Sequence, residues 1–75
     1  MDLDSSPSRI EAQLGRNLKA ARLCAGLTQQ EVAARAGIAV AFLAEIEKGV
    51  GDPDLRVIGA LAKAVGCPAF ELLKL

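Results

Sequence analysis

The sequence predicts an all-α domain, and three features of its composition support this prediction. Residues with high helix propensity dominate the chain, namely Ala, Leu, Glu, Lys, Arg and Gln. Val, Ile and Thr are sparse and do not alternate with polar residues, as they would in half-buried strands. Only two of the 75 residues are aromatic, so the core must be aliphatic and closely packed. A chain of this length forms one small domain, and we expect a compact bundle of five helices.

The first helix is expected over residues 9–25, ending at Gly26. Ser8 and Glu11 have the spacing of a capping box, in which each side chain accepts a hydrogen bond from a backbone N–H at the helix start. At 100° per residue its apolar side chains form one stripe, made of Ile10, Leu14, Leu18, Ala21 and Ala25. Residues 1–7 are polar and acidic, and they are expected to form a flexible N-terminal arm to a domain that covers residues 8–75.

Residues 29–36 and 39–48 are expected to form two short helices joined by a tight turn. Thr28 and Glu31 repeat the capping-box spacing at the start of the first. Gly37 ends that helix, and the next begins two residues later. Two short helices connected in this way have the shape of a helix-turn-helix.

A turn with the sequence VGDP, at 50–53, precedes the fourth helix, which is expected over residues 55–65 with Asp54 as its N-cap. Gly66 terminates it, and Pro68 suits the first turn of a short fifth helix. The side chains expected to face the core are Leu55, Ile58, Leu61, Ala62 and Val65 in the fourth helix and Phe70, Leu72 and Leu73 in the fifth.

Charge is balanced over the whole chain but not along it. Nine basic and nine acidic residues give a net charge of zero, which excludes the uniform electrostatic attraction of a strongly basic nucleic-acid binder. Residues 9–35, however, carry five basic and two acidic side chains. A surface that faces an anion is therefore expected to involve the first half of the fold.

Several classes of protein are not expected from this sequence. It has no histidine, and Cys24 and Cys67 match no metal spacing, so we expect no metal and no cofactor, and two reduced thiols. It also lacks a phosphate-binding glycine loop and a nucleophile with its base, so no enzymatic activity is expected. No apolar run approaches the roughly 20 residues of a membrane span, and the acidic N-terminus is unlike a signal peptide. We expect a cytoplasmic protein.

Motifs spread over most of the chain carry a family resemblance. They are Arg22, the run GLTQQEVAARAGI at 26–38, the run FLAEIEKG at 42–49, the turn DPDL, and the ending ALAKAVGCPAFELL. In these motifs the segment from Leu14 to Leu73 resembles the Cro and phage-repressor (XRE) family of helix-turn-helix DNA-binding domains. The resemblance implies a lambda-repressor-like fold and a transcriptional regulator that inserts the helix at about 39–48 into the major groove of DNA.

Arg22 and Glu47 are expected to form a structural ion pair. Arg22 lies at the edge of the apolar stripe of its helix, and Glu47 lies at the border of the apolar side of residues 39–48. These positions suit a partly buried pair, and the family resemblance implies one.

The remaining side of residues 39–48 is expected to face DNA bases. Phe42, Leu43 and Ile46 gather on the core side of this helix, and the opposite side carries Val40, Ala41, Ala44, Glu45 and Lys48. The first four are the candidate base-facing residues. Valine and alanine touch thymine methyl groups, while a glutamate accepts a hydrogen bond from cytosine.

Four residues are candidates for contacts with DNA phosphates. Gln29 begins the second helix, where free N–H groups and the helix dipole favour an anion, and the resemblance assigns it to a phosphate. Asn17, Lys19 and Lys48 are further candidates, although each is equally well explained as a solvated side chain.

Two functions remain open from the sequence. The first is a dimeric regulator that binds a palindromic operator in double-stranded DNA, since palindromic half-sites mirror a two-fold axis in the protein. The C-terminal segment FELLKL and the loop before it are then the expected contact between protomers. The second is a degenerate helix-turn-helix module whose apolar surface on residues 39–48, together with Leu23, binds a protein partner.

Overall fold

The computed structural model describes residues 9–74, which form five α-helices and no strand. The helices are α1 (Arg9–Cys24), α2 (Gln29–Ala36), α3 (Val40–Lys48), α4 (Leu55–Val65) and α5 (Ala69–Leu72). The all-α prediction is confirmed, and the bounds of α1 to α4 each lie within one residue of the expected ranges. The arm predicted at residues 1–7 and the cap predicted at Ser8 lie outside the described residues.

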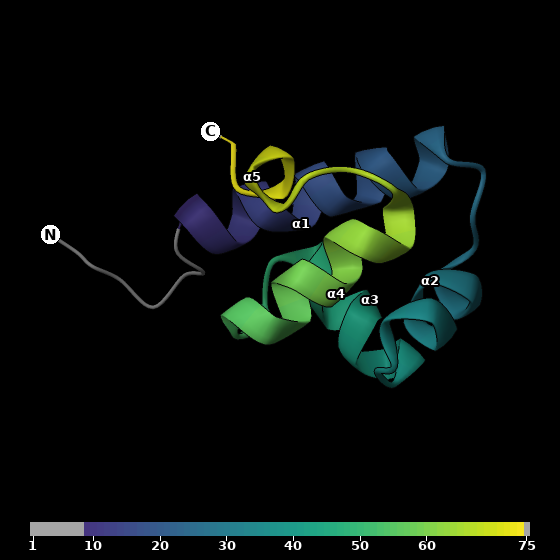
Figure 1. The fold of residues 1–75 in the computed structure, drawn as a ribbon. Helices are drawn as coiled ribbons and strands as arrows, with labels where there is room; N and C mark the ends of the chain where they lie inside the picture. Colours follow the sequence, from purple (N-terminus) through teal and green to yellow (C-terminus); the bar gives the residue numbers. More distant parts are fainter. Residues whose placement is uncertain (1–8, 75) are drawn as a thin grey trace, which may run out of the picture.

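The helices pack around a central α4 (Figure 1). Helix α1 packs on α3 and α5, while α4 contacts α1, α2 and α5. Helices α2 and α3 contact each other and lie together on one side of the molecule, with α5 on the other, next to α1 (Figure 1). Within residues 9–74, this arrangement leaves one side of the α2–α3 pair without a neighbouring helix.

Aliphatic side chains from all five helices form the core. Leu18, Leu43 and Leu61 are completely buried. The other core residues are Leu14, Val32, Ala33, Ile46, Ile58, Ala62, Ala64, Val65 and Leu72. Each helix therefore contributes at least one side chain to the same cluster, which holds the helix-turn-helix to the rest of the fold.

The prediction of core positions was wrong at several helix ends. Ile10, Leu55 and Phe70 are exposed over 60%, 79% and 65% of their surface, and Ala25 and Leu73 are exposed as well. Ile10 and Leu55 lie at the first turns of α1 and α4, and Phe70 lies in the four-residue α5. Periodicity fixes the direction of a side chain relative to its own helix, but at a helix end no other helix extends far enough to cover it.

The helix caps agree with the sequence in α2 and α4. The hydroxyl of Thr28 accepts a hydrogen bond from the Glu31 N–H at 3.0 Å, and the Glu31 carboxylate accepts one from the Thr28 N–H at 2.8 Å. Asp54 caps α4 by accepting from the N–H of Val57 at 2.9 Å. Pro68 is the N-cap of α5 and does not lie in its first turn as expected.

The tight turn between α2 and α3 depends on glycine. Gly37 has a φ of +74°, in the left-handed region that favours glycine, and its N–H bonds to carbonyls of the last turn of α2. Helix α3 then begins after Ala39, which provides no side-chain cap. The reversal is therefore complete within three residues and fixes the angle between the two helices.

Helices α1 and α3 lie close together at Gly15. A Cβ atom at this position would lie 2.5 Å from the carbonyl oxygen of Ile46 and 2.8 Å from that of Glu47. Both oxygens belong to backbone in the last turn of α3, so neither moves without the helix. The absence of a side chain at Gly15 thus sets the distance between α1 and α3.

We expect Gly15→Ala to lower the free energy of unfolding by about 1–3 kcal/mol, the usual cost of overpacking, although alanine is the better helix former. Gly59→Ala in α4 is the matched control, because its added Cβ meets nothing within 4 Å. It should raise the free energy of unfolding by about 0.5–1 kcal/mol. Urea denaturation measures both values, and equal stabilisation by the two substitutions would contradict the tight contact.

Candidate nucleic-acid interface

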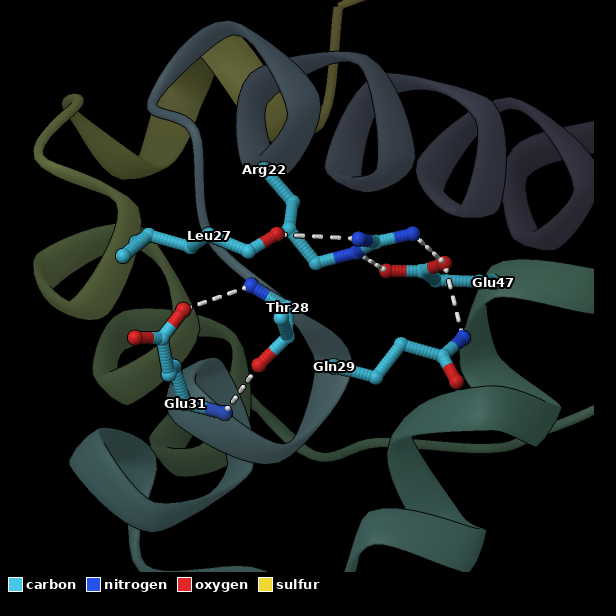
Figure 2. A network of polar contacts seen from close by, with 6 residues as sticks. All are labelled: Arg22, Leu27, Thr28, Gln29, Glu31 and Glu47. Atoms are coloured by element: carbon cyan, nitrogen blue, oxygen red, sulfur yellow. Dashed lines mark hydrogen bonds and ion pairs between the residues drawn. The ribbon is translucent and has the colours of Figure 1, made fainter.

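An ion pair between α1 and α3 organises the helix-turn-helix (Figure 2). The Nε and Nη2 atoms of Arg22 donate to the two carboxylate oxygens of Glu47 at 2.7 Å and 3.0 Å. The two side chains are only 10% and 4% exposed. This geometry is the bidentate pairing that a planar guanidinium makes with a carboxylate, at the two positions for which the sequence predicts an ion pair.

Arg22 also holds the segment that leads into α2. Its Nη1 atom donates to the carbonyl oxygen of Leu27 at 3.0 Å, one residue before the cap of α2 (Figure 2). The hydrogen bond to Glu47 raises the pKa of Arg22 above its ordinary value, against the opposing effect of burial. The guanidinium therefore stays charged and links α1, the α1–α2 loop and α3.

Gln29 completes this network from α2. Its side-chain Nε2 donates to Glu47 Oε1 at 3.1 Å, the same oxygen that accepts from Arg22 Nη2 (Figure 2). Gln29 is the first residue of α2, where backbone N–H groups have no partner within the helix. No local pattern in the sequence indicates a contact between Gln29 and Glu47, because these residues are 18 positions apart and their side chains meet only after the turn is folded.

The face of α3 that points away from the core is small and apolar at its start. Leu43 and Ile46 are fully buried, whereas Val40 is 41% exposed. The exposed face carries Ala39, Val40, Ala41, Glu45 and Lys48, with Ala44 partly buried beside them. All four residues that are expected to face bases thus lie on the exposed face of α3 or at its edge.

The candidate phosphate-facing residues occupy different places. Lys48 is exposed in the last turn of α3, and Lys19 is exposed on α1. Lys19 follows Gly15 by four residues and so shares the side of α1 that faces the last turn of α3. Lys48 thus lies at the carboxyl end of the exposed α3 face, and Lys19 lies on a neighbouring exposed part of α1.

Asn17 is directed to the C-terminal segment. Its Nδ2 donates to the carbonyl oxygens of Leu72 and Lys74 at 2.9 Å and 2.7 Å, and its Oδ1 accepts from Gln13 at 3.0 Å. Both amide hydrogens are therefore used within the protein. A phosphate contact by Asn17 stays a prediction, whereas its link to the end of the chain is part of the fold.

A basic residue beside the turn was not singled out from the sequence. Arg56, in the first turn of α4, is exposed and lines a hollow of about 330 Å³ together with Gly37 and Ile38 of the α2–α3 turn. Asp54 lines the same hollow. Arg35, by contrast, donates to the Ala64 carbonyl of α4 at 3.4 Å. The sequence does contain a pattern that could have indicated Arg56, because this residue directly follows the DPDL turn.

The two cysteines line another hollow, of about 280 Å³, between α1 and α5. Both are free thiols, and burial together with the nearby charge of Glu71 raises the pKa of Cys67. Among residues 9–74, no group of three or more His, Cys, Asp or Glu side chains is placed to hold a metal ion. No helix in that same range is long and apolar enough to cross a membrane.

Comparison with known proteins identifies the family. The helix-turn-helix family model HTH_3 matches residues 18–72, which include all of α2, α3 and α4. The chain belongs to the XRE-type helix-turn-helix family. This family consists of DNA-binding transcription regulators, and its signature segment coincides with the network around Glu47 and the exposed face of α3.

Individual known proteins are similar to this chain over most of its length. The HTH-type transcriptional regulator y4dJ of Sinorhizobium fredii is 37% identical over 60 residues, covering 80% of this chain and 78% of the relative. The restriction-modification controller protein C.AhdI from Aeromonas hydrophila has a TM-score of 0.79 and 28% identity, covering 81% of this chain and 92% of that chain. The hypothetical transcription factor NHTF from Neisseria has a TM-score of 0.84 and 25% identity, covering 97% and 87%.

We expect Arg22→Met to lower the free energy of unfolding by about 3–5 kcal/mol, because it leaves the buried Glu47 carboxylate without its cationic partner. Glu47→Leu should be comparably destabilising for the reciprocal reason. The double variant removes both charges and should be more stable than either single variant. Urea denaturation of the four proteins measures the coupling, and strictly additive effects would contradict a mutual pair.

Proposed function

We propose that this chain is a dimeric transcription regulator that inserts α3 into the major groove of a palindromic operator. The observation that carries the proposal is the exposed face of α3, which begins with Val40 at 41% exposure and is held outward by the Arg22–Glu47 network. Membership of the XRE-type family supplies the ligand class. In a helix-turn-helix protein, the second helix lies in the major groove and its N-terminal residues contact base edges.

The proposal assigns the exposed residues to two kinds of contact. Val40, Ala41, Ala44 and Glu45 face base edges, while the backbone start of α2 at Gln29 and the side chains of Lys19 and Lys48 approach phosphates. Phosphate contacts position the protein and base contacts specify the sequence. Because Gln29 already donates to Glu47, a phosphate bound there lies next to the same carboxylate and depends on the Arg22 charge to offset it.

Few cations lie on this surface, and this favours binding as a dimer. DNA affinity grows with the number of phosphates neutralised, and log K falls by about 0.9 per contact for each log unit of salt. Two lysines in each protomer give a weak electrostatic contribution. A second protomer doubles the number of phosphate contacts, although each protomer still contributes only two lysines.

The exposed apolar residues at the C-terminal end offer a surface for the second protomer. Phe70 is 65% exposed and Leu73 is 39% exposed, while Leu72 between them is buried. Phe70 is one of only two aromatic residues in the chain, and large aromatic side chains are enriched in protein interfaces. We therefore place the dimer contact at the segment FELLKL and the loop that precedes it.

A protein partner on α3 is the second candidate function. It is favoured by the apolar side chains at the start of α3 and by Leu23, which is 58% exposed on α1. Base edges present mostly hydrogen-bond donors and acceptors. The side chains of the first residues of α3 are apolar and can pair with neither. The following experiment separates the two functions.

Selection of random duplexes by the purified protein should recover a palindromic consensus, and the consensus should disappear with Val40→Asp. The new carboxylate lies in the first turn of α3, where the helix dipole tolerates it, so the fold is kept while the charge is repelled by the groove.

Gly59→Asp is the matched control, because it adds the same charge at an exposed position of α4 with nothing within 4 Å of the new Cβ. It should retain the consensus. If the folded wild-type protein enriches no duplex, the DNA-binding proposal is wrong and the protein-partner function takes its place.

Sedimentation equilibrium should show a dimer that Phe70→Asp dissociates, because a charge replaces an apolar contact at the interface. Circular dichroism serves as the control for folding, since Phe70 is mostly outside the core. A wild-type protein that is monomeric at millimolar concentration would exclude this dimer.

A further inference from the structure

The exposed face of α3 offers an unusually restricted chemistry to the bases. Three consecutive exposed residues, Ala39, Val40 and Ala41, carry no polar side-chain atom. One turn further along, Glu45 is exposed, and within residues 9–74 its carboxylate makes no hydrogen bond or ion pair. The side chains of this face can therefore make apolar contacts at its start and accept hydrogen bonds at Glu45.

Each of these two capabilities matches one feature of the major groove. The C5-methyl group of thymine is the apolar feature that a normal base pair presents there, whereas the other features are donors and acceptors. A carboxylate accepts from the amino group of cytosine and is repelled by the O4 acceptor of thymine in the same place. Val40 and Ala41 thus suit a methyl group, and Glu45 suits cytosine.

Helix geometry places the two features close together. Ala41 and Glu45 are four residues apart and share one line along α3. At 1.5 Å per residue they are separated by about 6 Å along the axis, which is less than two base-pair steps of about 3.4 Å. Both contacts therefore fall within one short half-site.

We propose that α3 reads pyrimidine C5-methyl groups through Val40 and Ala41 and a neighbouring cytosine amino group through Glu45. The inference rests on the proposed DNA-binding function and specifies its ligand. Since 5-methylcytosine carries its methyl group at the same C5 position as thymine, a methylated cytosine binds better than cytosine at the position read by Val40 or Ala41. The protein is thereby sensitive to cytosine methylation of its operator.

The test uses the duplex recovered by selection, with each thymine replaced in turn by deoxyuridine, which removes only the methyl group. One or two positions in each half-site should lose about fourfold in affinity, the factor that corresponds to the burial of one methyl group. Cytosine and 5-methylcytosine are then compared at those positions, where the methylated duplex should bind about fourfold more tightly.

Variants of α3 assign each effect to a side chain. Val40→Ala shortens an exposed side chain in the first helical turn and should reduce the deoxyuridine effect at one position. It should leave the effect at the position read by Ala41 intact. Glu45→Gln should change the preference at its position from cytosine to adenine, because glutamine pairs with the N6 and N7 atoms of adenine.

The outcomes separate this inference from the function on which it rests. A recovered consensus with affinities that change less than twofold at every deoxyuridine overturns the methyl readout and keeps DNA binding. A deoxyuridine effect that persists unchanged at every position in Val40→Ala and in Ala41→Gly shows that the methyl groups act through DNA shape and also overturns it. If no duplex is recovered, both the function and the inference are wrong.

Discussion

The rest of the fold depends on the burial of one carboxylate, that of Glu47. This group lies in the last turn of α3 and accepts hydrogen bonds from Arg22 of α1 and Gln29 of α2. A charged group that is 4% exposed is tolerated only when it is fully paired. The cost of leaving it unpaired therefore penalises any arrangement in which the three helices separate, and the outward direction of α3 follows from this penalty.

The sequence predicted those parts of the molecule that local chemistry determines. Thr28 and Glu31, Asp54 and the glycines at 26, 37, 49 and 66 mark helix ends through backbone geometry, and they need no knowledge of the tertiary structure. The predicted burial of Leu55 and Phe70 is wrong, because burial depends on whether another helix extends over a residue. The bond from Gln29 to Glu47 was missed for the same reason, since it exists only after α2 and α3 have been placed.

The predicted base-facing and phosphate-facing residues differ in how far the fold explains them. Val40, Ala41 and Glu45 lie on the surface because the core side of α3 is fixed by Leu43 and Ile46, so helical periodicity was sufficient. Asn17 has an amide whose direction depends on the path of the C-terminal segment, which no periodicity describes. Amphipathic pattern thus locates a surface, whereas the roles of single polar side chains require the packed structure.

Asn17 attaches the C-terminal segment to α1 in a way that does not depend on the side chains of that segment. It holds the C-terminal segment by the main-chain carbonyls of Leu72 and Lys74 and not by their side chains. Every amino acid supplies the same carbonyl, so substitutions at positions 73 and 74 leave this attachment intact. Asn17 therefore places no constraint on the exposed side chains of Leu73 and Lys74, so the surface that they form can change without loss of this link to α1.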